Sequence, residues 1–116
     1  MSIVEALWAV HFGDAYTPSQ PNGGVAILET SRIFGGDSQF YYVGKYEVTG
    51  EKLTAQVRIA HFSGPNMTAF GLPLACPLEL KLEGRRNGDM INGRMWPISQ
   101  PDLNLPVSLK RLEDLP

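Results

Sequence analysis

The clearest pattern in the chain is an alternation of apolar and polar side chains with a period of two. It is strongest near the middle of the chain, where Leu53, Val57 and Ile59 share one face and Gln56 and Arg58 share the other. A period of two is typical of a β-strand that buries one face and exposes the other. The same alternation recurs in shorter stretches, so we expect an all-β protein.

Seven or eight strands are expected, separated by clusters of Gly, Pro, Asn and Asp. Their expected ranges are 4–13, 25–29, 32–34, 38–48, 53–62, 78–83, 90–96 and 107–112. The leucines of the last segment also fit a helical spacing. Because each strand has one apolar face, the strands have to close or stack around a shared interior. We therefore expect a small antiparallel up-and-down β-barrel formed by a single domain, residues 1–116, with a two-sheet sandwich as the alternative.

Glycine-containing turns divide these strands. The sequence Gly35-Gly36-Asp37 is expected to reverse or bulge the chain, with Gly36 in the left-handed region of φ that glycine tolerates. Residues 49–52 and 86–89 are expected to be hairpin turns, the second because it contains Asn-Gly.

Two longer connections interrupt the strand pattern. Residues 14–24 are rich in Pro, Gly and polar side chains and are expected to form a loop. Residues 63–75 contain Met67, Phe70 and Leu74, so this connection is expected to pack on the end of its own barrel; a lid or a partner surface is the alternative. A short helical turn is a further alternative for residues 66–70.

The long strand at residues 38–48 gathers its aromatic residues on one face, which we expect to point inward with Gly44 at a bend. An inward aromatic set indicates either an ordinary barrel core or a cavity for an apolar ligand, in which tyrosine hydroxyls supply polar groups. Residues of the inward face of this strand are Phe40, Tyr42, Gly44, Tyr46 and Val48. Together with inward residues of other strands, the candidate cavity residues are Trp8, Phe12, Phe40, Tyr42, Tyr46, Val57 and His61.

Composition narrows the function classes. The chain has 10 basic and 12 acidic residues, and this net charge of -2 argues against a nucleic-acid-binding protein that works through a basic field. No stretch reaches the roughly 18 apolar residues that a membrane-spanning helix needs, and the first residues do not read as a signal peptide. Cys76 is the only cysteine, which excludes an intrachain disulfide and favours a reducing compartment. We therefore expect a cytoplasmic protein.

Residues that could carry catalysis or bind a metal are sparse. His11 and His61 with Asp14 or Asp37 could in principle hold a metal, but their spacing is not that of a known site, so we expect no metal and no cofactor. A hydrolase built on His61 with Ser38 or Cys76 would require these side chains within hydrogen-bond reach. This hydrolase hypothesis ranks behind two non-enzymatic hypotheses, and we expect that the protein is not an enzyme.

Residues 33–62 resemble the GrlR family, whose members are small negative regulators of bacterial type III secretion. The similarity lies in Gly35-Gly36-Asp37, in Tyr42 and Gly44 of the next strand, and in the alternating strand at residues 53–61. Residues 8–12, 82–84 and 91–93 also look like the family.

The resemblance implies a lipocalin-like antiparallel barrel, usually a homodimer, whose cavity takes an apolar molecule and which acts by contacting a protein such as a transcriptional regulator. The named member uses an acidic tetrad in the turn after its tyrosine strand; residues 47–52 of this chain read Glu-Val-Thr-Gly-Glu-Lys instead. The leading hypothesis is thus a regulatory or adaptor protein of the GrlR-like type that acts through protein contact. The alternative is a carrier of a small apolar ligand or lipid.

Overall fold

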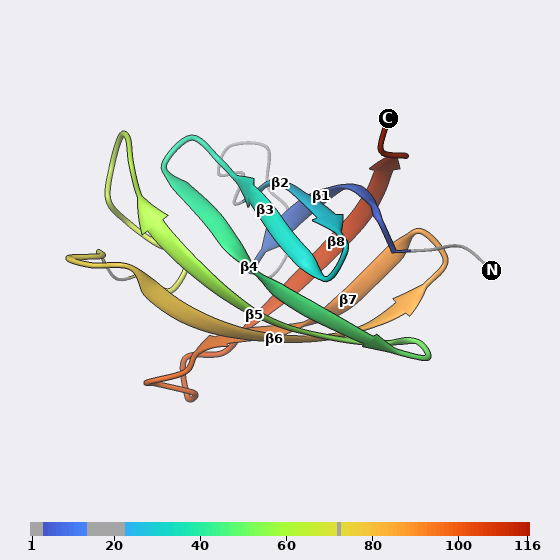
Figure 1. Ribbon diagram of the computed structural model, residues 1–116. Coiled ribbons are helices and arrows are strands. Elements are labelled where there is room, and N and C mark those ends of the chain that lie inside the picture. The colour runs from blue at the N-terminus through green and yellow to red at the C-terminus, as the bar shows by residue number, and fades with distance from the viewer. Residues whose placement is uncertain (1–3, 14–22, 72) are drawn as a thin grey trace.

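The computed structural model of the chain describes residues 4–13, 23–71 and 73–116. Within these ranges, eight antiparallel β-strands close into one barrel (Figure 1). Each strand pairs with the next one along the chain, and β1 also pairs with β8. The strands are β1 (Ala6–Phe12), β2 (Gly23–Glu29), β3 (Arg32–Gly36), β4 (Phe40–Thr49), β5 (Lys52–His61), β6 (Leu78–Asn87), β7 (Met90–Pro97) and β8 (Leu105–Glu113). This confirms the predicted all-β barrel, in the up-and-down arrangement that lipocalins share.

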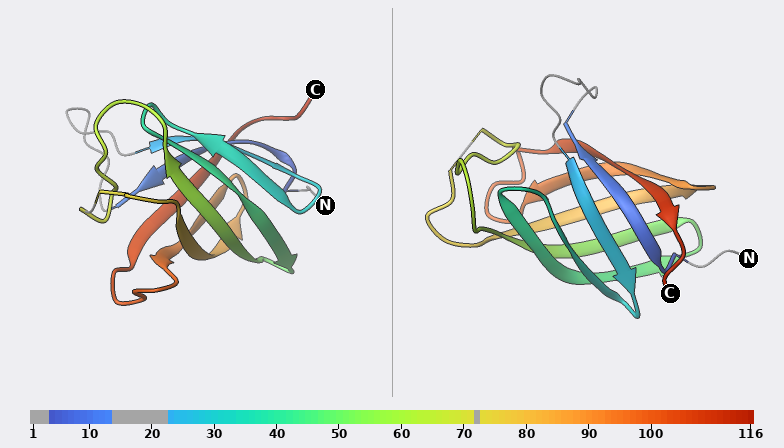
Figure 2. Two further views of the ribbon diagram at one scale, coloured as in Figure 1. Left: turned by 60° about the vertical axis from the view of Figure 1, so that its left-hand side comes forward. Right: turned by 90° about the horizontal axis from the view of Figure 1, so that it is seen from above.

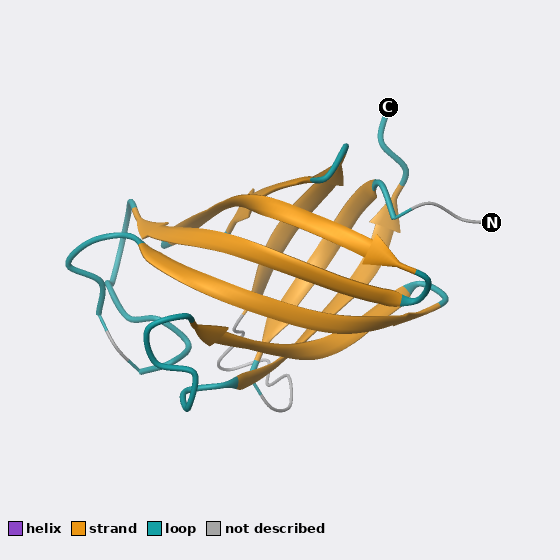
Figure 3. Cartoon of the chain, turned by 60° about the horizontal axis from the view of Figure 1, so that its bottom comes forward, coloured by secondary structure: helices purple, strands orange, loops and turns teal. Residues whose placement is uncertain are grey.

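Strands, turns and loops account for all the described residues (Figure 3). The tail that also fitted a helical spacing is the strand β8, and residues 66–70 form a loop with one turn, in which the Gly71 amide donates to the Thr68 carbonyl oxygen at 3.0 Å. The helical alternatives for these two segments are therefore not adopted. Among the described residues, no helix is long and apolar enough to cross a membrane.

Period-two burial organises the barrel interior as the sequence predicts. On β5, Leu53, Val57 and Ile59 are buried, whereas Gln56 and Arg58 are exposed. The same alternation brings inward side chains from all eight strands into one apolar cluster. The predicted inward positions on β8 are also confirmed, because Val107 and Leu109 are buried.

Three two-residue hairpin turns lie together at one end of the barrel, as the up-and-down order requires (Figure 2). The turn between β2 and β3 is Thr30-Ser31, with φ angles of 50° and 65°. The other two begin at Gly50 and Gly88, with φ angles of 62° and 64°. The last turn is shifted by one residue from its expected position, because Asn87 still pairs with Met90 in the ladder.

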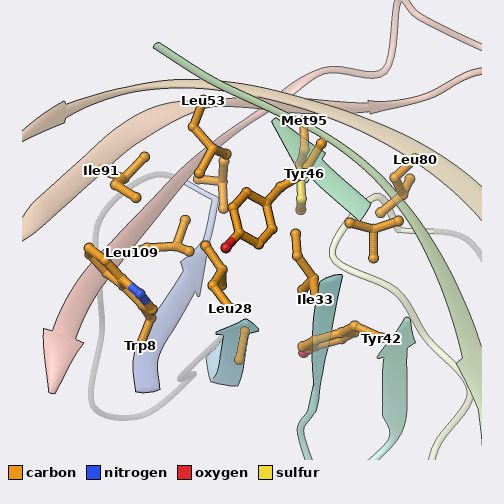
Figure 4. Packing of buried hydrophobic residues seen from close by; sticks show 14 of the residues in the cluster. Trp8, Leu28, Ile33, Tyr42, Tyr46, Leu53, Leu80, Ile91, Met95 and Leu109 are labelled. Carbon is orange, nitrogen blue, oxygen red and sulfur yellow. The ribbon is translucent and has the colours of Figure 1, made fainter. Parts of the chain in front are cut away.

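Large side chains fill the barrel near these turns (Figure 4). Trp8, Leu28 and Ile91 are fully buried there, and the Tyr46 ring lies among them. The Trp8 indole Nε1 donates a hydrogen bond to the Val4 carbonyl oxygen at 2.9 Å, so its polar atom is satisfied. We refer to this region as the packed end of the barrel.

Two glycine pairs lie in strands rather than in loops. Gly23 and Gly24 begin β2, although they were expected in the loop 14–24; residues 14–22 of that loop lie outside the described residues. Gly35 and Gly36 end β3, and neither has a positive φ, so the predicted left-handed conformation of Gly36 is wrong. These glycines are instead required by close backbone approach: a Cβ atom at Gly35 would lie 2.2 Å from the Val25 carbonyl oxygen.

The predicted inward face of β4 is correct except at its end. Phe40, Tyr42 and Tyr46 are buried, but Val48 is 48% exposed. The ladder between β3 and β4 ends at the pair Arg32 and Lys45, so Val48 lies beyond the reach of β3 and has only β5 beside it. Gly44 lies against β5, where a Cβ atom would be 2.2 Å from the Gln56 carbonyl oxygen, which agrees with the close approach expected there.

Candidate functional site

A cavity of about 150 Å³ extends from the other mouth of the barrel as far as Leu28, at the edge of the packed end. It is bounded by the end of β1, the start of β4 and the loop that follows β5, and all eight strands contribute to its wall. The lining side chains are mostly apolar. The apolar lining residues are Val10, Phe12, Ala26, Leu28, Ile33, Phe40, Val57, Ile59, Met67, Ala69, Phe70, Leu80, Leu82, Met95, Val107 and Leu109.

The polar groups of the cavity come mainly from the turn between β3 and β4. Asp37, Ser38 and Gln39 belong to this turn, and the Tyr42 hydroxyl and Thr68 complete the polar lining. Asp37 carries the only full charge among the described lining residues. An apolar wall with a few convergent polar groups is the usual composition of a small-molecule site.

The Asp37 carboxylate is held in place by its own turn. Its Oδ1 atom accepts hydrogen bonds from the backbone amides of Gln39 and Phe40, each at 2.8 Å. The Asp37 amide in turn donates to the Phe40 carbonyl oxygen at 3.0 Å. Aspartate commonly stabilises a turn in this way, and the consequence is a carboxylate with a fixed direction.

The second carboxylate oxygen of Asp37 meets Tyr42. The Tyr42 hydroxyl donates to Asp37 Oδ2 at 2.5 Å, and the Phe12 ring packs edge-on against the Tyr42 ring with centroids 5.7 Å apart. Burial raises the pKa of the Tyr42 hydroxyl strongly, and the hydrogen bond to Asp37 and the charge of Asp37 raise it further. Tyr42 therefore keeps its proton and donates a hydrogen bond to Asp37.

The connection between β5 and β6 covers one side of the cavity. Asn66 fastens this loop to itself: its Nδ2 donates to the Leu74 carbonyl oxygen at 2.7 Å, and its Oδ1 accepts from the Leu74 amide at 2.9 Å. Thr68 is only 7% exposed, and Phe70 packs against the barrel core. This confirms the expectation that the loop packs on its own barrel end.

The residues predicted to line a cavity fall into three places. Phe12, Phe40, Tyr42 and Val57 line it. Trp8 and Tyr46 point inward too, but they belong to the packed end and take no part in the cavity. His61 lies beside the site, with its ring centroid 5.6 Å from that of Phe40.

Of the residues predicted as a structural turn, Asp37 also belongs to the site, whereas Gly35 and Gly36 are strand residues outside the cavity lining. Sequence reasoning named none of the lining residues on β2, β3, β6, β7 and β8 as cavity residues. It also missed the loop residues 67–70, although the apolar content of that loop was a signal that it packs on the barrel.

The hydrogen bond that a hydrolase on His61 requires is not made among the described residues. His61 Nε2 donates instead to the Gly64 carbonyl oxygen at 2.8 Å, and Cys76 is exposed. Within the described part of the chain, no three His, Cys, Asp or Glu side chains gather in a way that could hold a metal ion.

A row of apolar side chains on the outer face of the barrel forms a second feature, here named the outer apolar strip. Ile27, Phe34 and Val43 lie side by side in the ladders of β2, β3 and β4, and the adjacent row contains Val25 and Tyr41. Four of these five residues are exposed and Phe34 is half-buried. Exposed apolar side chains that lie together on one face are typical of a contact surface.

No protein-family model and no curated protein matches the sequence. The cavity and the outer apolar strip are therefore interpreted from their own geometry.

Proposed function

We propose that the protein binds a small apolar molecule inside its barrel, and acts as a carrier or sensor of that molecule. The observation that carries this proposal is the cavity, which combines an apolar wall with a fixed polar corner at Asp37 and Tyr42. A barrel whose only task is stability would be expected to fill this volume, as the packed end does with Trp8 and Tyr46. Open space toward one end of the barrel, with dense packing at the other end, supports a binding site.

The volume limits the size of the ligand. Apolar cavities of roughly 150 Å³ hold a molecule about as large as benzene, whereas sites for drug-sized ligands measure about 300–1,000 Å³. The cavity of about 150 Å³ thus favours a single ring or a short branched chain over a long-chain lipid. This narrows the ligand class that the sequence suggested.

Binding of toluene to the purified protein tests the proposal, with the rise in melting temperature as the measurement. Val57→Phe places an aromatic ring in the cavity and is expected to abolish the rise. Gln56→Phe is the matched control, because it adds the same ring on the exposed face of β5. Native mass spectrometry of the freshly purified protein provides a second readout, since a retained small molecule would add mass. No toluene effect on the wild type and no retained mass would contradict the proposal.

A regulatory or adaptor role through protein contact is the second candidate function. The resemblance to the GrlR family supports it, and the outer apolar strip gives it a surface on which a partner could bury Val43 and its neighbours. By that resemblance, the first partner to test is a second copy of the chain, and a transcriptional regulator is the second. We propose the cytoplasm as the compartment, where a free exposed Cys76 thiol would persist.

Sedimentation equilibrium tests the first partner. A homodimer that uses the outer apolar strip should dissociate in Val43→Lys and persist in Thr54→Lys, which adds the same charge on β5 away from the strip. A monomer at every concentration would rule out the homodimer.

Co-purification tests the second partner. The wild type expressed at native level should co-purify with a transcriptional regulator that Val43→Lys no longer retains. Recovery of no such protein would count against the second candidate function.

A further inference from the structure

The Asp37 carboxylate and the Tyr42 hydroxyl, which form the polar corner of the cavity, present hydrogen-bond acceptors to a ligand and no spare donor. A carboxylate has about four lone-pair positions. In Asp37 the backbone amides of Gln39 and Phe40 occupy two of them on Oδ1, and the Tyr42 hydroxyl occupies one on Oδ2. One position on Oδ2 is left for a ligand. The Tyr42 hydroxyl uses its only hydrogen in the bond to Asp37, so its oxygen too can only accept from a ligand.

The described wall of the cavity carries no positive charge. Among the described lining residues there is no Lys, Arg or His, and Asp37 supplies a negative charge. Ser38 and Gln39 are uncharged, and Ser38 is exposed at the mouth of the cavity. A carboxylate brought into this cavity would lose its hydration, face the charge of Asp37 and find no cation in return. A hydroxyl or ammonium group would instead donate to the open position on Oδ2.

We propose that the cavity selects small apolar molecules that carry one hydrogen-bond donor, a hydroxyl or an ammonium group, and rejects carboxylates of the same size. This selectivity rests on the proposed binding function, since it concerns the ligand class of the same cavity. Asp37 is the specificity-determining residue, and Tyr42 is the positioning residue that fixes the direction of its carboxylate.

Four single-ring probes test the selectivity: toluene, benzyl alcohol, benzylamine and benzoate. They share one ring and differ in the group attached to it, and their dissociation constants can be compared by calorimetry or by chemical-shift titration at neutral pH. We expect benzyl alcohol or benzylamine to bind at least about tenfold more tightly than benzoate, because only they can donate to Asp37. The order of these two probes identifies whether the hydroxyl or the cation is preferred.

Asp37→Asn changes the hydrogen-bonding groups of the polar corner and keeps the turn. The asparagine oxygen can still accept from the amides of Gln39 and Phe40, while its NH₂ group replaces the Oδ2 acceptor by a donor. This variant should lose the preference against benzoate. Asp102→Asn is the matched control, because Asp102 is exposed outside the cavity lining, and it should retain the preference.

The outcomes separate the selectivity from the binding function. If toluene binds and benzoate binds as tightly as benzyl alcohol, the selectivity is wrong and the binding function stands. If none of the four probes binds, the binding function itself fails. The wild-type series decides between these results even if Asp37→Asn does not fold.

Discussion

The Tyr42 hydroxyl and the Asp37 carboxylate form a hydrogen bond of 2.5 Å across the turn between β3 and β4. The two residues are only five positions apart, but one belongs to the turn and the other to the inward face of β4. Their contact anchors the turn to the barrel wall and places the one charge of the described lining at the cavity. The proposed selectivity of the cavity depends on this pair.

The first prediction concerns alkaline pH. Burial and the neighbouring Asp37 raise the pKa of Tyr42 above its ordinary value of 10.0. The pKa of Tyr46 is raised as well, by burial and by the charges of Glu5 and Glu29, although its hydrogen bond with the Ser31 backbone lowers it. Below about pH 10 both tyrosines are protonated in the folded and unfolded chains. Above it the unfolded chain releases these protons and the folded chain retains them, so the free energy of unfolding should fall as pH rises.

Urea unfolding of the wild type and of Tyr42→Phe across this range measures the effect. The variant should show a shallower fall in the free energy of unfolding above about pH 10, because one of the two shifted groups is gone. An identical slope in both proteins would contradict the assignment of a protonated, buried Tyr42.

The second prediction concerns the turn at Thr30-Ser31. Both residues have positive φ, which a two-residue turn of this type requires and which glycine adopts without strain. Ser31→Gly should therefore stabilise the protein by about 0.5–1 kcal/mol, because relief of the left-handed conformation outweighs the entropy cost of the added glycine. Gly50→Ala is the matched comparison, since Gly50 has a φ of 62° in the neighbouring turn and should lose about 1 kcal/mol. Thermal unfolding measures both, and a shift of the same sign in the two variants would contradict the turn geometry.

The third prediction separates close approach from backbone conformation. Gly35→Ala should destabilise the barrel by about 2 kcal/mol or more, because its methyl group would overlap the Val25 carbonyl oxygen. Gly36→Ala should cost less, since the nearest atom is the Phe40 carbonyl oxygen at 2.9 Å. Chemical denaturation gives both values. Equal losses would indicate that contact distance does not explain these glycines.

The strands could be predicted from the sequence because burial of alternate residues is a local signal, as Leu53, Val57 and Ile59 show. The exposure of Val48 could not be predicted from the sequence, because it depends on where β3 ends beside β4. A glycine doublet in the sequence likewise does not reveal whether it serves a turn or a close contact between strands, which is why the expected conformation of Gly36 was wrong.

The candidate site could be predicted only in part, for a related reason. Alternation identifies the inward face of a strand and not the position of a residue along the barrel axis. Tyr42 and Tyr46 share a face of β4, but Tyr42 reaches the cavity and Tyr46 fills the packed end. The bond between Asp37 and Tyr42 depends on the path of the turn, which alternation does not describe.

The fourth prediction concerns the loop over the cavity. Asn66→Ala removes both hydrogen bonds that tie this side chain to Leu74, so the loop should open more often and admit ligand faster. Hydrogen exchange of the Leu74 amide and the exchange rate of bound toluene should both increase. Asn92→Ala, an exposed position on β7, is the control that should leave both rates unchanged. Unaltered rates in Asn66→Ala would show that the loop does not control access.

A crystal structure determined under xenon pressure tests the central claim most directly, because xenon enters apolar cavities of about this size. The account predicts a xenon atom inside the barrel, surrounded by Phe12, Tyr42, Val57 and Val107, and none at the packed end beside Trp8. A barrel whose side chains fill this space and admit no xenon would contradict it.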